Sequence, residues 1–280
     1  MTDRISFQGE PGANSHIAAR DFYPGFEPLP CASFEDAFAA VSEGQARYAM
    51  IPIENSVAGR VADVHHLIPE SGLFIIAEHF MPIRHQLLGL KSATLAGLRE
   101  VRSHPQALGQ CRKVLRELGV KPVTTVDTAG AAREIAELGD NHVGALASTL
   151  AAEIYGLQVL RADMADAAHN TTRFLVFARE AQTPKDGPCM TSFVFRVRNV
   201  PAALYKALGG FATNGVNIVK LESYMIDAWF TVAQFYAEIE GHPDQRSVRL
   251  ALEELGFFSR EVKILGVYPA HPFRRGGGGK

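Results

Sequence analysis

Short β-rich runs alternate with helical patterns from residue 3 to about residue 162, and this alternation most limits the folds open to the chain. Strand-like runs separated by helices form βα units, which build largely parallel sheets. The expected strands are ISF (5–7), RYAMIPI (47–53), PVTTV (122–126), HVGALA (142–147) and LQVLRA (157–162). The expected helix start signals are Asn14 or Ser15, Ser33 paired with Asp36, and Thr128. The first part of the chain is therefore predicted to have an α/β fold.

The segment LFIIAEHFMPIRHQLLGL (73–90) breaks this alternation, because it stays strand-like for too long to be one short core strand. We predict that it crosses between two lobes and that the segment around residues 163–177 crosses back. Two α/β lobes joined in this way enclose a cleft, which is the usual place for a small ligand. The polar sequence HNTTRF (169–174) would lie beside that cleft.

A second domain is predicted after EAQTPKDGPCM (180–190), whose two prolines, glycine and mixed charges are typical of a linker. The following residues read as strand, helix, strand, strand, helix and strand, and this βαββαβ order matches the ferredoxin-like plan. Pro201 is expected at the first position of the first helix and Asn214-Gly215 at its end. The tail FRRGGGGK has no pattern and is expected to be flexible. The six segments are TSFVFRVRN (191–199), PAALYKALGGFATN (201–214), VNIVKLESYMI (216–226), WFTVAQFYAEIE (229–240), DQRSVRLALEEL (244–255) and VKILGVYP (262–269).

The composition is that of a soluble globular protein without an affinity for polyanions. With 280 residues, of which 47% are hydrophobic and 21% charged, the chain can bury a large core in two domains. Its formal net charge of −2 leaves no basic excess, so nucleic acid is not an expected partner. The N-terminal MTDRISFQGE lacks a signal-peptide pattern, and the apolar run LFIIA is too short to span a bilayer. We therefore expect a cytoplasmic protein with no membrane partner.

Neither the cysteines nor the histidines are spaced as metal ligands. Cys31, Cys111 and Cys189 are far apart and never form a C-x-x-C pair, which predicts reduced thiols that serve in packing. His65 and His66 are adjacent, so on a helix they would point about 100° apart. We expect no metal.

Four strand-to-helix turns carry polar residues where the edge of a sheet can bind an anion. They are FQGEPGANS (7–15), IPIENSVAGR (51–60), RSHPQALGQC (102–111) and DTAGAA (127–132). The first is not the GxGxxG pattern of a dinucleotide site, and each turn alone is more often structural than functional. Together with TTRF they form a set suited to holding carboxylates. No Ser/His/Asp order or nucleophile elbow appears, so binding, orientation and hydrogen-bond donation are the expected tasks.

Taken in order, these motifs resemble those of prephenate dehydratase. They are FQG-x-x-GA-x-S, PIENS-x-x-G, SHPQAL-x-QC, TAGAA, GALAS and TTRFLVF, followed by a βαββαβ domain containing NVPAALYKAL and a Glu-Ser pair. The resemblance covers nearly the whole chain. It implies an α/β protein with a two-lobed, periplasmic-binding-protein-like catalytic domain and a ferredoxin-like ACT domain, a module that binds amino-acid effectors.

The resemblance also implies domain limits. The catalytic domain would comprise residues 1–180, with lobe 1 at about 1–77 and 165–180 and lobe 2 at about 78–164. A linker at 181–190, an ACT domain at 191–270 and a flexible tail at 271–280 would follow.

The implied reaction converts prephenate into phenylpyruvate, water and carbon dioxide, on the committed route towards phenylalanine. Loss of the ring carboxylate pushes electrons through the diene as hydroxide departs, so the chemistry requires neither a redox cofactor nor a metal. The protein must supply a proton or a strong hydrogen bond to the leaving hydroxyl, together with fixed dipoles that orient the anion.

By resemblance, Thr172 of the Thr-Arg-Phe motif donates a hydrogen bond to the departing hydroxyl, directly or in relay. Arg173 either pairs with a substrate carboxylate or locks Glu54 in place, and Glu54 is also a candidate acid. Phe174 is expected to pack inward, and His104 to serve its turn rather than donate the proton. The candidate substrate contacts are Ser15, Asn55, Ser56, Ser103, Gln106, Thr128 and Phe174.

The second domain departs from the ACT pattern at two places. The familiar Gly-Ala-Leu is Ala202-Ala203-Leu204, and the familiar Glu-Ser-Arg-Pro is Glu222-Ser223-Tyr224-Met225. The first change adds a methyl group where the backbone approaches an effector, and the second removes a cation and a rigid turn. The family implies binding of L-phenylalanine and an ACT–ACT interface, hence a homodimer or homotetramer. The candidate effector contacts are Asn199, Ala203, Leu204, Glu222 and Ser223.

Two alternatives stay open. Arogenate dehydratase performs the same chemistry on an analogue that has an ammonium in place of the keto group, and the sequence does not separate the two substrates. A non-catalytic sensor of small anions would share the two lobes and the ACT domain but would need no donor for a leaving group.

Overall fold

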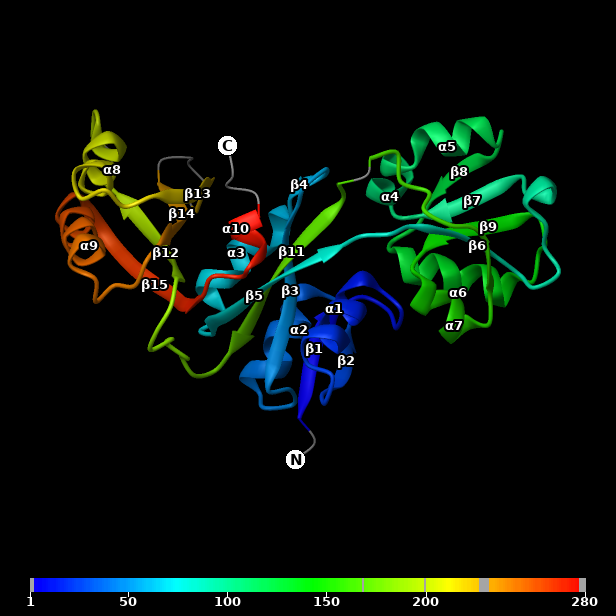
Figure 1. Cartoon of the computed structure of the whole chain (residues 1–280), viewed down its shortest axis with the longest axis horizontal. Coiled ribbons are helices and arrows are strands. Elements are labelled where there is room, and N and C mark those ends of the chain that lie inside the picture. Colours follow the sequence, from blue (N-terminus) through cyan, green and yellow to red (C-terminus); the bar gives the residue numbers. More distant parts are fainter. Residues whose placement is uncertain (1–2, 168, 199, 227–231, 277–280) are drawn as a thin grey trace. The chain divides into compact units, whose positions relative to one another are not determined.

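The computed structural model describes residues 3–167, 169–198, 200–226 and 232–276 (Figure 1). The chain divides into two compact units. The first unit comprises Met1–Val64 and His79–Phe174, and the second comprises His65–Glu78 and Leu175–Lys280. Strands β5 (Phe74–Pro82) and β11 (Thr171–Ala178) each contribute residues to both units.

The first sheet has the strand order β2-β1-β3-β11-β5, with the short strand β4 (Gly59–Arg60) paired to β3. Strand β1 (Arg4–Gln8) is parallel to both of its neighbours, β2 (Glu27–Cys31) and β3 (Tyr48–Asn55). Strand β2 was not predicted, because its sequence EPLPC contains two prolines. That strand lies at the edge of the sheet, where proline is tolerated. Helices α1 (Asn14–Phe22) and α2 (Phe34–Ser42) connect these strands.

The second sheet has the order β10-β6-β9-β7-β8. Its strands are β6 (Gln86–Gly89), β7 (Glu100–Ser103), β8 (Lys121–Thr124), β9 (Val143–Ala147) and β10 (Gln158–Arg161). Figure 1 shows α4 (Pro105–Gln110) and α5 (Arg112–Glu117) on one face, and α6 (Thr128–Leu138) and α7 (Thr149–Tyr155) on the other. The alanines of α6 lie in the core on its face of the sheet, so the helix packs closely against the strands.

The predicted crossings between lobes are confirmed, whereas the prediction of largely parallel sheets is only partly correct. Strand β5 belongs to the first sheet and β6 to the second, while β10 and β11 lead back. Strand β7 is parallel to β8 and β9, but β6 is antiparallel to both β9 and β10. The reason is that β6 enters directly from the other lobe, without the helical crossover that parallel strands require.

The helix starts are corrected at three places. Ser33 caps α2 and accepts from the Asp36 N–H as predicted, but Ala13 precedes α1, and Asp127 rather than Thr128 caps α6. Helix α8 (Ala203–Thr213) does not begin at Pro201. The residue directly before the helix, Ala202, has a left-handed φ of 61°, so the helical conformation starts only at Ala203. The helix end at Asn214 is confirmed.

Residues 189–269 form the predicted βαββαβ order with an antiparallel sheet, β13-β14-β12-β15. Its strands are β12 (Cys189–Val197), β13 (Ile218–Met225), β14 (Ala233–Glu240) and β15 (Ser259–Pro269). Helices α8 and α9 (Arg246–Phe258) cover one face (Figure 1). Beneath them lies a core of phenylalanine and aliphatic side chains. The opposite face carries polar side chains, because inward and outward positions alternate along each strand.

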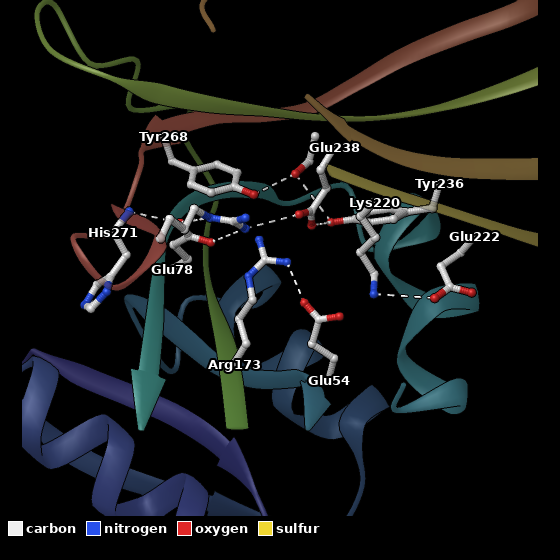
Figure 2. Close-up of polar contacts among 11 residues, drawn as sticks. Glu54, Glu78, Arg173, Lys220, Glu222, Tyr236, Glu238, Tyr268 and His271 are labelled. Carbon is white, nitrogen blue, oxygen red and sulfur yellow. Dashed lines mark hydrogen bonds and ion pairs between the residues drawn. The ribbon is translucent and has the colours of Figure 1, made fainter. Parts of the chain in front are cut away.

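That polar face contains a buried ion-pair network (Figure 2). The Arg274 guanidinium contacts Glu78 at 2.7 Å and Glu238 at 3.5 Å, and both carboxylates are almost fully buried. Tyr236 donates a hydrogen bond of 2.5 Å to Glu238. We predicted that residues 271–280 form a flexible tail, but Phe273–Gly276 form a short helix, α10, and Arg274 is fixed by this network. Residues 277–280 lie outside the part that the structure describes.

Gly266 in β15 allows the packing of β15 against β5 to be tested. A Cβ atom added at Gly266 would overlap the backbone carbonyl oxygen of Ile75 in β5, which cannot move independently of its strand. We expect Gly266→Ala to lower the free energy of unfolding by about 1–3 kcal/mol or more. The matched control is Gly256→Ala in the exposed part of α9, where a Cβ meets nothing within 4 Å. This control should be neutral or slightly stabilising in a denaturant titration, and equal losses in both variants would contradict the prediction.

Candidate functional site

A cavity of the first unit has a volume of about 690 Å³ and receives side chains from both lobes. Lobe 1 contributes the end of β1, the start of α1, the end of β3 and the start of β11. Lobe 2 contributes the starts of β6, α4 and α6. The polar lining residues are Gln8, Asn14, Ser15, Ser33, Glu35, Asn55, Arg60, Asp63, His85, His104, Gln106, Gln110, Asp127, Thr128 and Thr172.

The helix starts at this cavity supply unpaired backbone donors by their geometry. The first turn of any α-helix has N–H groups with no partner inside the helix, and its dipole favours an anion. Asn14 and Ser15 lie in the first turn of α1 and Thr128 in that of α6, whereas the Gln106 N–H in the first turn of α4 already donates to His104 Nδ1. Arg60 is the one arginine or lysine among the described lining residues.

The Asn55 side chain is held at both ends of its amide. Its Oδ1 accepts from the backbone N–H groups of Val57 and Ala58 at 2.9 and 2.8 Å, which fixes which end of the amide is oxygen. Its Nδ2 must therefore donate, and it does so to Asn170 Oδ1 at 2.7 Å and to Thr172 Oγ1 at 3.0 Å. The backbone of the loop after β3 thus determines the hydrogen-bonding state of Thr172.

This arrangement decides what the Thr172 hydroxyl can do. A hydroxyl has one hydrogen and two acceptor lone pairs, and here one lone pair already accepts from Asn55. Its hydrogen cannot point back at the Asn55 amide and is directed to another acceptor. Thr172 lines the cavity and is 9% exposed, so a ligand oxygen there can receive this hydrogen bond.

Gln110 and His85 extend the same network. Gln110 Oε1 accepts from Asn170 Nδ2 at 2.9 Å and lies 2.8 Å from His85 Nε2. Because Gln110 uses its oxygen there, His85 must carry its proton on Nε2. Burial lowers the pKa of His85, against the smaller opposing effect of the Gln110 hydrogen bond, so the ring is held neutral.

Arg173 and Glu54 form an ion pair of 3.0 Å (Figure 2). The Arg173 side chain is 2% exposed, and its guanidinium lies 5.8 Å from the centre of the Phe80 ring. Neither Arg173 nor Glu54 lines the cavity. Of the two roles considered for Arg173, this geometry favours the locking of Glu54 over contact with a ligand.

His104 occupies the turn position expected of it. It caps α4, and its Nδ1 accepts from the Gln106 N–H at 3.2 Å. Burial lowers the pKa of His104, and the nearby Asp127 carboxylate opposes that shift. The lowered pKa favours the neutral ring, and the hydrogen bond to the start of α4 orients it. His104 also lines the cavity.

The structure brings most predicted substrate contacts together but separates two. Ser15, Asn55, Gln106, Thr128, Thr172 and Phe174 all line the cavity. Ser103 is fully buried and donates to the Leu146 carbonyl at 2.7 Å, and Ser56 donates to the His169 carbonyl at 2.6 Å. Both hydroxyls serve the fold, since strand ends and loops need their carbonyls satisfied.

The predicted effector contacts lie in the second unit and do not all share one face. Asn199 lies outside the described residues. Ala203 is buried at the start of α8, with Leu204 half-buried beside it. Glu222 and Ser223 are consecutive in β13, so they point to opposite faces of the sheet. Glu222 pairs with Lys220 at 3.4 Å (Figure 2), which leaves Ser223 for the other face.

The site residues that the sequence did not predict include Arg60, His85, Gln110 and Asn170. Arg60 and Gln110 stood at or near the ends of motifs already noted, and Asn170 preceded TTRF. Only His85 had no local signal, because it lies in the crossing segment and meets Gln110 through the tertiary fold.

In the described part of the chain, no group of three or more His, Cys, Asp or Glu side chains is arranged to hold a metal ion. No described helix is both long and apolar enough to cross a membrane.

Fold and site together define a class: a two-lobed α/β protein with a donor-rich cavity lined by both lobes, followed by a ferredoxin-like βαββαβ module. Comparison with known protein families identifies the family. Residues 5–182 match the prephenate dehydratase family model. The chain belongs to the prephenate dehydratase family, whose members are enzymes.

Individual relatives agree over nearly the whole chain. A bifunctional N-acyl-homoserine lactone acylase/prephenate dehydratase of Komagataeibacter europaeus is 52% identical, covering 97% of each chain. The chloroplastic arogenate dehydratase/prephenate dehydratase 1 of Arabidopsis thaliana is 39% identical over 95% of this chain and 72% of its own. The crystal structure of prephenate dehydratase in complex with L-Phe from Arthrobacter aurescens is 28% identical, with a TM-score of 0.87, covering 95% of this chain and 90% of that one.

The neutral His85 predicts a pH dependence of stability. Because its pKa is lower in the folded than in the unfolded chain, the unfolded state binds the proton more readily once the pH falls below about 6.5. Stability associated with this group is therefore present at neutral pH and is lost on acidification. His85→Gln keeps an N–H donor for Gln110 but cannot titrate. We expect the melting temperature of the wild type to fall further between pH 7 and 5 than that of His85→Gln, and parallel curves would contradict this.

Proposed function

We propose that this chain catalyses the decarboxylative dehydration of prephenate to phenylpyruvate. The observation that carries the proposal is the Thr172 hydroxyl, which accepts from Asn55 and so has its hydrogen available to a ligand in the cavity. Membership of the prephenate dehydratase family supplies the reaction that needs such a donor.

The overall reaction consumes one proton. The ring carboxylate leaves as carbon dioxide, the electrons of its C–C bond move through the diene, and the ring C–O bond breaks. The departing hydroxide takes up a proton and becomes water, while the ring becomes aromatic. A hydrogen bond from Thr172 stabilises the negative charge that develops on this oxygen. Threonine is too weak an acid to be the final proton source alone, so solvent or another group delivers the proton through it or beside it.

The remaining cavity residues bind and orient the substrate dianion. Arg60 and the first turns of α1 and α6, with Ser15 and Thr128, provide positive potential and donors for its carboxylates. Gln106 adds a side-chain donor, and Phe174 supplies an apolar wall for the ring. Arg173 and Glu54 act from outside the cavity, by holding the start of β11 in place.

Arogenate is the alternative substrate for the same mechanism. It differs from prephenate only by an ammonium in place of the keto group, and the Arabidopsis relative is named for both substrates. Glu35, Asp63 and Asp127 line the cavity and could attract that ammonium. Parallel assays with both substrates decide between them.

A second candidate activity is the hydrolysis of N-acyl-homoserine lactones at the amide bond. It is favoured by one observation, the 52% identity over nearly the full length of both chains to a relative named for this activity as well. In that reaction water adds to the acyl carbonyl and the amine of the lactone leaves with a proton.

We further propose that residues 191–270 form an ACT domain that binds L-phenylalanine. The βαββαβ order and the Arthrobacter relative solved with L-Phe support this. Ala203, Leu204 and Ser223 are the candidate contacts, while the Glu222 carboxylate is paired with Lys220 on the opposite face of the sheet. Inhibition through this domain, in a homodimer or homotetramer, requires different affinities of the ligand for the active and inhibited states.

The catalytic proposal predicts a graded series at one position. Thr172→Val keeps the shape but removes the hydroxyl, so kcat for phenylpyruvate formation should fall by about 10²- to 10⁴-fold with the fold intact. Thr172→Ser restores the donor and should recover most of the activity. A Val variant with near wild-type kcat would refute the role of Thr172.

The same preparations separate the other candidates. Thr213→Val is the matched control for Thr172→Val, because the Thr213 hydroxyl lies outside the cavity, at the end of α8, where it bonds the Gly209 and Gly210 carbonyls. Folded wild-type protein that forms neither phenylpyruvate from prephenate nor phenylalanine from arogenate, but hydrolyses an N-acyl-homoserine lactone, would replace the first candidate with the second. Inactivity on all three substrates would favour a small-anion sensor.

The effector proposal predicts thermal stabilisation by L-phenylalanine. A ligand present at about 100 times its Kd stabilises the folded state by about 2.7 kcal/mol. The melting temperature should therefore rise in millimolar L-phenylalanine, with no rise in L-alanine at the same concentration. The absence of any shift with L-phenylalanine would count against an effector site.

A further inference from the structure

A second cavity lies within the second unit, on the face of the βαββαβ sheet opposite α8 and α9. Its volume is about 330 Å³, near the lower end of the range for small-molecule sites. All four strands of the sheet contribute to it, and α3 (Ala62–Glu70) adds three residues. None of the predicted effector contacts that the structure describes lines this cavity.

A fixed chain of hydrogen bonds forms one wall of this cavity. Arg196 Nε donates to Gln234 Oε1 at 2.6 Å, and Gln234 Nε2 donates to the Tyr224 hydroxyl at 2.6 Å. Gln234 is 4% exposed, and Arg196 is also held by Glu261 at 3.1 Å. The side chains are therefore oriented before any ligand arrives, which lowers the entropic cost of binding.

The hydrogen bonds run from Arg196 through Gln234 to Tyr224, so the Tyr224 hydroxyl at the end of the series can still donate. The Tyr224 oxygen accepts from Gln234, so the phenol hydrogen is available to another acceptor. Burial, the largest effect, raises the pKa of Tyr224, so the phenol keeps its proton. The ring is held edge-to-face against His66, with centroids 4.7 Å apart.

Lys263 supplies a cation to the same cavity. Its Nζ donates to the Pro69 carbonyl at 2.7 Å, which uses one of three N–H bonds. The Arg196 charge is matched by Glu261, whereas Lys263 has no ion pair within 4 Å among the described residues. Val194, Met225 and Ile226 add apolar surface, and Glu70 is an exposed acceptor at the rim.

We propose that this cavity is a binding site for a small carboxylic acid with a compact apolar body. The carboxylate would receive hydrogen bonds from the Tyr224 hydroxyl and the Lys263 ammonium, while the apolar body contacts Met225 and Ile226. A ligand that also carries an ammonium could place it against Glu70. Tyr224 and Met225, which stand where the resemblance leads us to expect Arg-Pro, both line this cavity.

The probes are 4-methylpentanoate and L-leucine, which differ only by the ammonium group. Binding of each to the full chain is measured by isothermal titration calorimetry. Neither probe is aromatic, so the outcome does not depend on prephenate chemistry. We expect binding of at least one probe, and the preferred probe tells whether Glu70 takes part.

Two variants and one control test the location. Tyr224→Phe removes only the hydroxyl and Lys263→Met only the charge, and each should raise Kd about tenfold, the cost of one hydrogen bond to a charged group. Tyr205→Phe is the matched control, because Tyr205 lies on α8 and is 82% exposed. The proposal is overturned if neither probe binds at 10 mM, or if both variants bind the probes with unchanged Kd. Because Lys263 is exposed, its replacement tests the site even if Tyr224→Phe fails to fold.

Discussion

Two backbone N–H groups in the loop after β3 hold the Asn55 amide, and the candidate catalytic site depends on this interaction. It fixes the amide orientation, which makes Asn55 a donor to Thr172 and leaves the Thr172 hydrogen for a ligand. Asn170 and Gln110 continue the network to His85. In such a network each group is satisfied and oriented by the next, so the donor is in place before the substrate arrives.

Strands β5 and β11 are shared by the two compact units. Each contributes to both compact units, and β11 carries Thr172 and Arg173 at its start. Phe80 of β5 packs against Arg173, and Glu78 of the same strand is paired with Arg274. The proposed hydrogen-bond donor Thr172 is thus placed on a strand and not on a loop.

Local patterns predicted the elements well and their ends less well. The Ser33 cap, the His104-Pro105 start and the βαββαβ order all follow from interactions between near neighbours. The α1 and α6 starts were misplaced by one or two residues, because several adjacent residues can act as caps and the packed chain selects one. Ser56 and Ser103 were misjudged for a different reason: carbonyls from distant segments took their hydroxyls.

The sequence alone determined the α/β class, the two lobes, the second domain and the family motifs that carry Thr172, because hydrophobic periodicity and turn residues act over a few positions. Only the tertiary structure decided that Arg173 lies outside the cavity, that His85 supports Gln110, and that Tyr224 lines a separate cavity. These outcomes depend on which side chains meet after segments 25 or more residues apart pack together. No local pattern encodes such partners, since each is chosen by burial and hydrogen-bond satisfaction in the whole fold.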